Sequence, residues 1–239
     1  MNLFLKKLLL IWLFVFPIQT YSATPSLPDF SQYKDVKEKK KAFFQWMLPK
    51  IEKANQDILQ ERAFIERSTP KKPLSAKWQA LVEKYRIDPK NKSPQQIKSL
   101  LLRRVDIIPP SLALAQAANE SSWGTSRFAK KAFNFYGQWC FTQGCGLVPN
   151  QRSAGLKHEV RKFENPTASV KSYMRNLNSH PSFKALRDIR LSLRKANQPL
   201  EGKALSAGLL SYSERKQDYI KELNAMIRVN KLSKYDLKP

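Results

Sequence analysis

The segment Leu112–Ala118 constrains the fold of this 239-residue chain more than any other. Its sequence, LALAQAA, is apolar on nearly every side of a helix, and such a helix is buried rather than amphipathic. Pro109-Pro110-Ser111 comes directly before it and favours a helix start, while Gly124 is a natural residue to follow the helix end at Trp123. The sequence therefore predicts a helix buried in a hydrophobic core.

Amphipathic helical patterns fill most of the remaining chain. Apolar residues recur at helical spacing over residues 35–67, 74–85, 91–105, 166–177, 182–193, 200–210 and 214–229. Pro49 is expected to kink or divide the first of these helices. Ser93, Pro94 and Gln96 give the third a favourable start, with a capping serine, a proline at the first position and a glutamine at the third.

Residues 133–163 hold most of the internal glycines and no long helical pattern. We expect a loop there with a small hairpin, whose strand candidates are Leu147–Val148 and Glu159–Phe163. The chain has only 7 glycines, which argues against an all-β protein with many tight turns. The predicted fold class is therefore mainly α (α+β): a helical domain with a small β-hairpin and a helical N-terminal extension.

Charge and composition limit the classes of function. Lys and Arg together number 43 and Asp and Glu 19, so the formal charge is 43 − 19 = +24, which predicts a polyanionic partner without identifying it. Hydrophobic residues make up 42% of the chain, enough for a real core, so a wholly disordered chain is excluded. With two His and two Cys, a four-ligand zinc site is barely possible, and no metal or cofactor site is predicted.

Residues 1–23 have the layout of a secretory signal peptide. Lys6 and Lys7 precede the short apolar run Leu8–Phe16, and small residues follow at Ser22 and Ala23. The run is too short to cross ~30 Å of hydrocarbon as a helix; an uncleaved membrane anchor is the alternative. We expect export to the periplasm, which would leave a mature charge of 24 − 2 = +22.

Export would also place the two cysteines in an oxidising compartment, which bears on their expected state. Cys140 and Cys145 bracket four residues, and in an oxidising compartment we expect them to form a small disulfide loop. Two free buried thiols are the alternative. Metal binding by this pair is not expected, because no His or carboxylate cluster adjoins it in the sequence.

Glu120 is the candidate for chemistry. Most glutamates on helices are solvated, but this one lies near the end of the most apolar helix in the chain, with Gln116 four positions before it. Burial and the negative end of a helix dipole both disfavour ionisation, and a carboxyl that keeps its proton near neutral pH suits a general acid. The alternatives are a solvated glutamate or a buried structural one paired with an arginine.

Four motifs in order give the chain a resemblance to a known family. They are AQAANESSWGTS at residues 115–126, AFNFYG at residues 132–137, the set Phe163, Ser169, Tyr173 and Leu177, and LSYS at residues 210–213 followed by Tyr219. Together they resemble the bacterial glucosaminidase family over residues 109–232. These are peptidoglycan-cleaving glycoside hydrolases with a lysozyme-like fold. The basic N-terminal extension and the Cys140/Cys145 loop resemble the Bax-type proteins of Gram-negative bacteria.

The resemblance implies roles for individual residues. Glu120 would be the catalytic acid that protonates the glycosidic oxygen next to N-acetylglucosamine. The substrate-site positions would be Gln116, Trp123, Asn134, Tyr136, Trp139 and Tyr212. Asn134 would fix the loop behind the site rather than touch sugar, and Tyr212 would turn its hydroxyl to the cleft. The aromatic residues at 123, 136 and 139 would line the cleft, with plain core packing as the alternative for each.

The second carboxylate is where the match to the family weakens. Glycosidases generally use two carboxyl groups, and in this family the second usually comes from the hairpin. Here the first strand candidate has no acid, so Glu159, in the second, is the preferred choice. Glu164 is the alternative, although it also suits a charge near a helix start. A third possibility is that the acetamido group of the substrate replaces the second carboxylate.

Three functions follow from these features. The first is a periplasmic endo-β-N-acetylglucosaminidase that cleaves peptidoglycan without a cofactor, contacts the cell envelope peripherally and does not bind nucleic acid. The second is a lytic transglycosylase, and the third a non-catalytic basic protein that binds an anionic envelope polymer or nucleic acid. The expected organisation is a signal peptide (1–23), a basic helical N-terminal region (24–105), a catalytic domain (106–232) and a tail (233–239).

Overall fold

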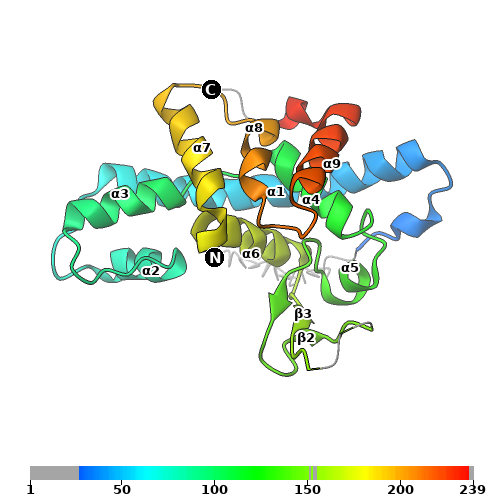
Figure 1. Ribbon diagram of the computed structural model, residues 1–239, viewed down its shortest axis with the longest axis horizontal. Helices are drawn as coiled ribbons and strands as arrows, with labels where there is room; N and C mark the ends of the chain where they lie inside the picture. Colours follow the sequence, from blue (N-terminus) through cyan, green and yellow to red (C-terminus); the bar gives the residue numbers. More distant parts are fainter. Residues whose placement is uncertain (1–26, 151, 153–154, 237–239) are drawn as a thin grey trace, which may run out of the picture.

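The computed structural model describes residues 27–150, 152 and 155–236. The expected signal peptide, residues 1–23, lies outside the described residues. The described part is mainly helical with one small three-stranded sheet, so the predicted fold class is confirmed (Figure 1). No helix in these ranges is both long enough and apolar enough to cross a membrane.

Helix α1 (Val36–Arg67) is the longest element, with 32 residues, and runs lengthwise through the molecule in Figure 1. Asp35 caps it by accepting a hydrogen bond from the Glu38 amide at 2.8 Å. Pro49 lies inside the helix without dividing it. Apolar residues on both sides of Pro49, including Met47 and Ile51, are fully buried, and this packing outweighs the ~3 kcal/mol cost of an interior proline.

Two shorter helices, α2 (Ala76–Lys84) and α3 (Pro94–Arg104), complete the N-terminal part. The predicted start of α3 is confirmed as a reciprocal capping box. The Ser93 hydroxyl accepts a hydrogen bond from the Gln96 amide at 3.2 Å, and the Gln96 side chain accepts one from the Ser93 amide at 2.7 Å. Both groups would otherwise be unpaired at the helix end.

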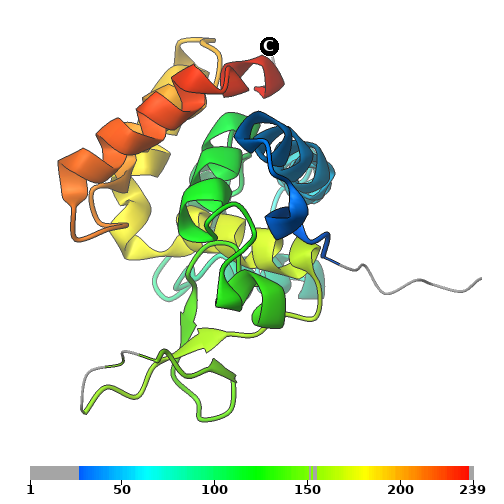
Figure 2. The same ribbon diagram turned by 90° about the vertical axis from the view of Figure 1, so that its right-hand side faces the viewer.

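The central helix α4 (Pro110–Glu120) is buried as predicted, with every residue from Pro110 to Ala118 buried. Figure 2 shows α4 between α1 and α9 (Lys216–Val229). The prediction that the helix continues to Trp123 is wrong, because the helix ends at Glu120 and the three residues 122–124 adopt positive φ. The last of these is Gly124, where a Cβ would lie 2.7 Å from the Phe30 ring.

The remaining helices are α5 (Arg127–Ala132), α6 (Pro166–Ser179), η2 (Pro181–Phe183), α7 (Lys184–Lys195), α8 (Gly202–Ser206), η3 (Ala207–Leu209), α9 and η4 (Leu232–Tyr235), and η1 (Phe30–Gln32) precedes α1. Among them, α6, α7, α8 with η3, and α9 follow the predicted pattern with small shifts at their ends, whereas α5, η1 and η4 were not predicted. Helices α8 and α9 and the short η4 all pack on α4, so the C-terminal part of the chain covers the side of α4 that α1 leaves open.

The sheet lies on one side of the helical body, below α6 in Figure 1. Strand β3 (Glu159–Arg161) is central and pairs antiparallel with β1 (Trp139–Cys140) and with β2 (Gly146–Leu147). The predicted strand candidates therefore correspond to β2 and β3. The first strand was not predicted, because it has only two residues and its sequence carries no alternating pattern.

One hydrophobic core contains residues from Phe30 to Leu232, so the N-terminal helices and the rest of the chain are packed together. Asn55 of α1 exchanges two hydrogen bonds with the backbone of Ile108, at 2.8 and 3.1 Å, just before α4. Asp106 is buried and forms ion pairs with Arg62 of α1 at 3.5 Å and with Arg194 of α7 at 2.9 Å. These buried contacts fix α1 to the start of the central helix.

Candidate active site at the end of the central helix

Glu120 is the last residue of α4 and is half-buried. Its Oε1 atom accepts a hydrogen bond from the Tyr219 hydroxyl of α9 at 2.8 Å. Its other oxygen, Oε2, lies beside Gly137, where a Cβ would be only 3.6 Å away. Gly137 is exposed and has a φ of +63°, a conformation that favours glycine. The absence of a side chain at Gly137 leaves Oε2 uncovered on this side.

A chain of hydrogen bonds leads through the core to Glu120. The Tyr173 hydroxyl donates to Gln116 Oε1 at 2.6 Å, and Gln116 Nε2 donates to the Tyr219 hydroxyl at 2.9 Å. An amide nitrogen cannot accept and an amide oxygen cannot donate, so the direction of each bond is fixed. The single proton of Tyr219 therefore points to Glu120 Oε1. When Glu120 is neutral, this bond favours its carbonyl oxygen at Oε1 and its proton on Oε2.

The surroundings of Glu120 favour its neutral form. Burial raises the pKa of Glu120, and this effect outweighs the hydrogen bond from Tyr219 and the attraction of Arg215, which both lower it. Glu222 adds to the increase, although it is itself paired with Arg215. Burial also raises the pKa of Tyr219, so its hydroxyl stays protonated and keeps donating. A proton on Glu120 would therefore lie on Oε2, beside Gly137.

Two stacked tyrosine pairs surround this chain. Tyr136 stacks on Tyr173 with ring centroids 3.8 Å apart, and Tyr212 stacks on Tyr219 at 5.5 Å. The Tyr212 hydroxyl donates to the Tyr136 carbonyl at 3.0 Å. Tyr136 is 2% exposed, and its hydroxyl is the only buried side-chain polar atom without a partner among the described residues. Tyr136 therefore lies behind the site, while the half-buried Tyr212 borders it.

The two tryptophans expected at the cleft lie in different surroundings. Trp139 is 57% exposed and stacks on His158 with ring centroids 4.0 Å apart, so it remains accessible to a ligand. Trp123 is half-buried and packs edge-on against Phe43 and Phe44 of α1. The structure accounts for Trp123 by core packing, the alternative weighed for it from the sequence.

Asn134 ties the turn behind the site to the sheet. Its Nδ2 donates to the carbonyls of Gln138 and Arg161, at 2.8 and 2.9 Å, and its Oδ1 accepts from the amides of Tyr136 and Gln138. It is 1% exposed, so the side chain is fully used within the protein. These contacts give Asn134 the loop-fixing position expected of it.

The predicted disulfide between Cys140 and Cys145 is present. Glu159 lies opposite Cys140 in the sheet, and its two oxygens accept hydrogen bonds from the amides of Gly144 at 2.9 Å and Gly146 at 2.7 Å. These two bonds lower the pKa of Glu159. Within the described residues, no hydrogen bond joins Glu159 to Glu120. The side chain is engaged in holding the disulfide loop, and its role as the second catalytic carboxylate stays a prediction.

Sequence reasoning identified Glu120 and Gln116 but assigned no role to Tyr173, Tyr219 or Gly137. The structure brings these three residues together around Glu120. All three belong to the four family motifs, so the signal was present in the sequence. The sequence does not show which of these groups hydrogen-bond to one another, because that depends on how α6 and α9 pack on α4.

A half-buried carboxyl group with a raised pKa and one oxygen free of protein hydrogen bonds suits the general acid of a glycoside hydrolase. Comparisons with known proteins place the chain in a family of such enzymes. The family model described as mannosyl-glycoprotein endo-beta-N-acetylglucosaminidase, Glucosaminidase for short, matches residues 96–232. The chain belongs to this glucosaminidase family, which confirms the resemblance found in its sequence.

A curated relative and a solved structure are also similar to the chain. Protein bax of Escherichia coli strain K12 is 32% identical over 209 residues, which cover 86% of this chain and 74% of that protein. The catalytic domain of the autolysin Auto from Listeria monocytogenes aligns with a TM-score of 0.42 and 18% identity, over 90% of this chain and 92% of that one.

Proposed function

We propose that the protein is an endo-β-N-acetylglucosaminidase that cleaves the glycan strands of peptidoglycan, with Glu120 as general acid. The observation that carries this proposal is the state of Glu120: its pKa is raised, Tyr219 binds Oε1, and Oε2 faces the open side beside Gly137. Membership of the glucosaminidase family supports the type of bond. The glycan substrate follows the family resemblance, and the N-terminal segment supports action in the periplasm.

In the proposed reaction, the carboxyl group at Oε2 protonates the glycosidic oxygen, so the leaving sugar departs as a neutral alcohol. Positive charge then develops at the anomeric carbon. Tyr219 continues to donate to Oε1 and stabilises the carboxylate that forms, because hydrogen bonds to the charged form favour it. Tyr212, which stacks on Tyr219, and the exposed Trp139, two residues after Gly137, would provide surfaces for the sugars.

The group that attacks the anomeric carbon is the second part of the proposal. Both oxygens of Glu159 are bound by backbone amides, which makes this carboxylate a weak base. We therefore favour attack by the acetamido oxygen of the substrate, with Glu159 shaping the loop. Water then opens the resulting oxazolinium ion and gives its proton to the Glu120 carboxylate, which restores the acid. Glu222 also acts on Glu120 through its charge, but it is paired with Arg215.

One observation also supports a lytic transglycosylase as the second candidate. Both oxygens of Glu159, the preferred second carboxylate, are already bound by backbone amides. A transglycosylase needs only one acid/base glutamate. It would leave anhydro-sugar ends where a hydrolase leaves reducing ends.

The test is digestion of purified sacculi followed by mass spectrometry of the muropeptides. We expect new reducing ends at N-acetylglucosamine, and we expect Glu120→Gln to lose ~10²–10⁴ in rate, the usual contribution of a positioned acid. The exposed Glu52 on α1 provides a matched control, because Glu52→Gln makes the same change away from the site. Near-normal activity of a folded Glu120→Gln protein would remove Glu120 from the mechanism, and anhydro-sugar products would select the transglycosylase.

A further inference from the structure

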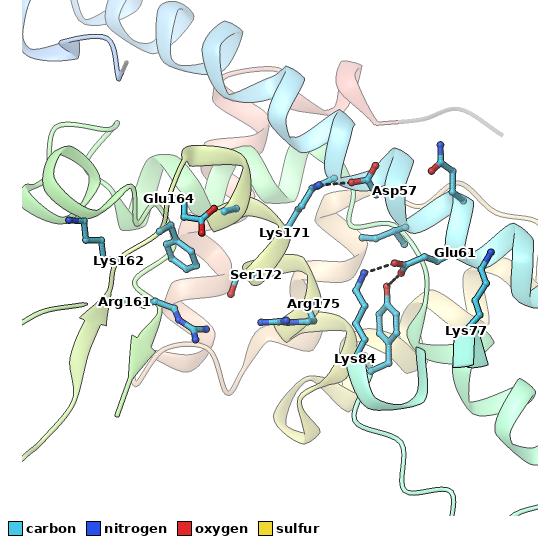
Figure 3. Close-up of a pocket in the computed structure, with 16 residues that line it drawn as sticks. Asp57, Glu61, Lys77, Lys84, Arg161, Lys162, Glu164, Lys171, Ser172 and Arg175 are labelled. Atoms are coloured by element: carbon cyan, nitrogen blue, oxygen red, sulfur yellow. Dashed lines mark hydrogen bonds and ion pairs between the residues drawn. The ribbon is translucent and has the colours of Figure 1, made fainter. Parts of the chain in front are cut away.

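A cavity of about 810 Å³ lies between the N-terminal helices and the remainder of the molecule. Helices α1 and α2 form one wall, and strand β3 and helix α6 form the other (Figure 3). A smaller recess of about 140 Å³ shares Arg161, Ser172 and Arg175 with the cavity and extends to Arg86, Gln138 and Trp139. We call the two together the basic groove. Its α1 and α2 wall lies outside residues 96–232, the part matched by the family model.

The acidic residues of the α1 wall are already neutralised. Asp57 pairs with Lys171 at 2.6 Å, and Glu61 pairs with Lys84 and accepts a hydrogen bond from the Tyr85 hydroxyl at 2.6 Å. Figure 3 shows these contacts along the upper and right-hand parts of the cavity. They leave the α1 acids no free charge with which to balance further cations in the groove.

Three arginines in the groove have no such partner. In the part of the chain that the structure describes, no carboxylate lies within 4.0 Å of the guanidinium groups of Arg86, Arg161 or Arg175. In Figure 3, Arg161 and Arg175 point toward one another beside Ser172. Burial lowers the pKa of Arg175, and the charges of Arg161 and Arg86 lower it further.

The smaller recess of the groove is lined by the two residues that follow Gly137 in the chain. Gly137 lies beside Glu120 Oε2, and the following residue, Gln138, lines the recess together with Trp139. The Cα atoms of residues 137 and 139 are at most ~7.6 Å apart, because consecutive Cα atoms are ~3.8 Å apart. The Arg161 amide also donates to the Gln138 carbonyl at 2.9 Å, so Arg161 is anchored beside the residue that follows Gly137.

We propose that the arginine pair Arg161 and Arg175 binds a carboxylate carried by the N-acetylmuramic acid residue next to the cleaved bond. Guanidinium groups suit this ligand, because their parallel donors match the two oxygens of a carboxylate. The source is either the stem peptide, whose chain would lie along the wider cavity, or the lactyl group of a strand without peptides. This inference rests on the proposed function. It gives the N-terminal helices a role as one wall of a substrate groove.

The test compares three substrates: peptide-bearing glycan strands, strands stripped of peptides by an amidase, and an uncharged chito-oligosaccharide. The variant carries Arg161→Gln and Arg175→Gln. The control carries Arg67→Gln and Arg228→Gln, which removes the same two charges from exposed positions outside the groove. We expect the double variant to lose ~10-fold or more in kcat/KM on a strand whose carboxylate it binds, the effect of a charge-assisted hydrogen bond, and nothing on the uncharged oligomer.

The two sources give different results. A loss on peptide-bearing strands alone identifies the stem peptide, and a loss on stripped strands identifies the lactyl carboxylate. Unchanged activity on both, or an equal loss on the uncharged oligomer, would overturn the proposal. Calorimetry with the free stem tripeptide and with N-acetylmuramic acid separates this result from failure of the proposed function. If these ligands bind to the wild type and not to the double variant, the arginine pair is a carboxylate site even if the protein cleaves no glycan.

Discussion

Replacing Tyr219 with phenylalanine tests the hydrogen-bond chain that controls Glu120. The change removes one oxygen that accepts from Gln116 at 2.9 Å and donates to Glu120 at 2.8 Å. Gln116 is fully buried, so its Nε2 would lose its acceptor, at a cost of ~1–3 kcal/mol. For a chain of this size that corresponds to a fall in Tm of roughly 2–12 °C. The ring and its stacking on Tyr212 would remain.

The same change has a second, more specific effect. The hydrogen bond from Tyr219 lowers the pKa of Glu120, so its removal should raise that pKa further. The alkaline limb of the kcat/KM profile should therefore move to higher pH, while kcat on the plateau falls by ~2–10-fold, the value of one hydrogen bond. Tyr212→Phe is the matched control, because the Tyr212 hydroxyl donates to the Tyr136 carbonyl rather than to Glu120. An unmoved limb in Tyr219→Phe, or an equal displacement of the limb in both variants, would refute the reasoning.

Three further changes test other parts of the site. Burial raises the folded pKa of Glu120 above its unfolded value, so folding stability is lost as the pH rises through the folded pKa. Glu120→Gln should therefore be more stable than the wild type near pH 7 but not near pH 4. The expected difference is ~1.4 kcal/mol for every pH unit between the folded and the unfolded pKa. Thermal unfolding at both pH values would show this. Glu159→Gln should keep most of the glycosidase activity but speed reduction of the Cys140–Cys145 disulfide by dithiothreitol, because the variant loses an acceptor for the amide of Gly144 or Gly146. A ~10²-fold loss of glycosidase activity with the loop intact would instead make Glu159 the second catalytic carboxylate. Gly137→Ala places a methyl group 3.6 Å from Glu120 Oε2 and should reduce kcat strongly, whereas Gly155→Ala, at a similar positive φ with nothing within 4 Å, should not.

The parts of the fold that depend on short-range signals were predictable from the sequence. The capping box at Ser93 and Gln96 involves residues three positions apart, so the pattern itself determines the contact. The all-apolar helix after Pro110 had to be buried, because no orientation of it leaves a polar face in water. For the same reason Glu120 could be identified as unusual before its partners were known.

Other features depend on contacts between distant segments, and the sequence did not predict them. Pro49 remains inside α1 because residues on both sides of it are buried against the rest of the core. Helix α4 ends at Glu120 rather than at Trp123, since the backbone turns there to bring Gly124 against Phe30. The role of Glu159 depends on the disulfide loop folding back over its carboxylate, which no local pattern encodes.

The N-terminal helices bear on the candidate site in two ways, although residues before position 96 lie outside the family match. Asn55 of α1 satisfies both the amide and the carbonyl of Ile108, and Arg62 pairs with Asp106, so α1 holds the segment that leads into α4. A rigid helix transmits that position along its axis to Glu120 at its other end. The same helix supplies one wall of the basic groove. A shift of α1 would therefore displace both the candidate acid and the groove wall that faces the proposed carboxylate site. This is a physical reason for the extension to be packed into the core rather than joined to it by a linker.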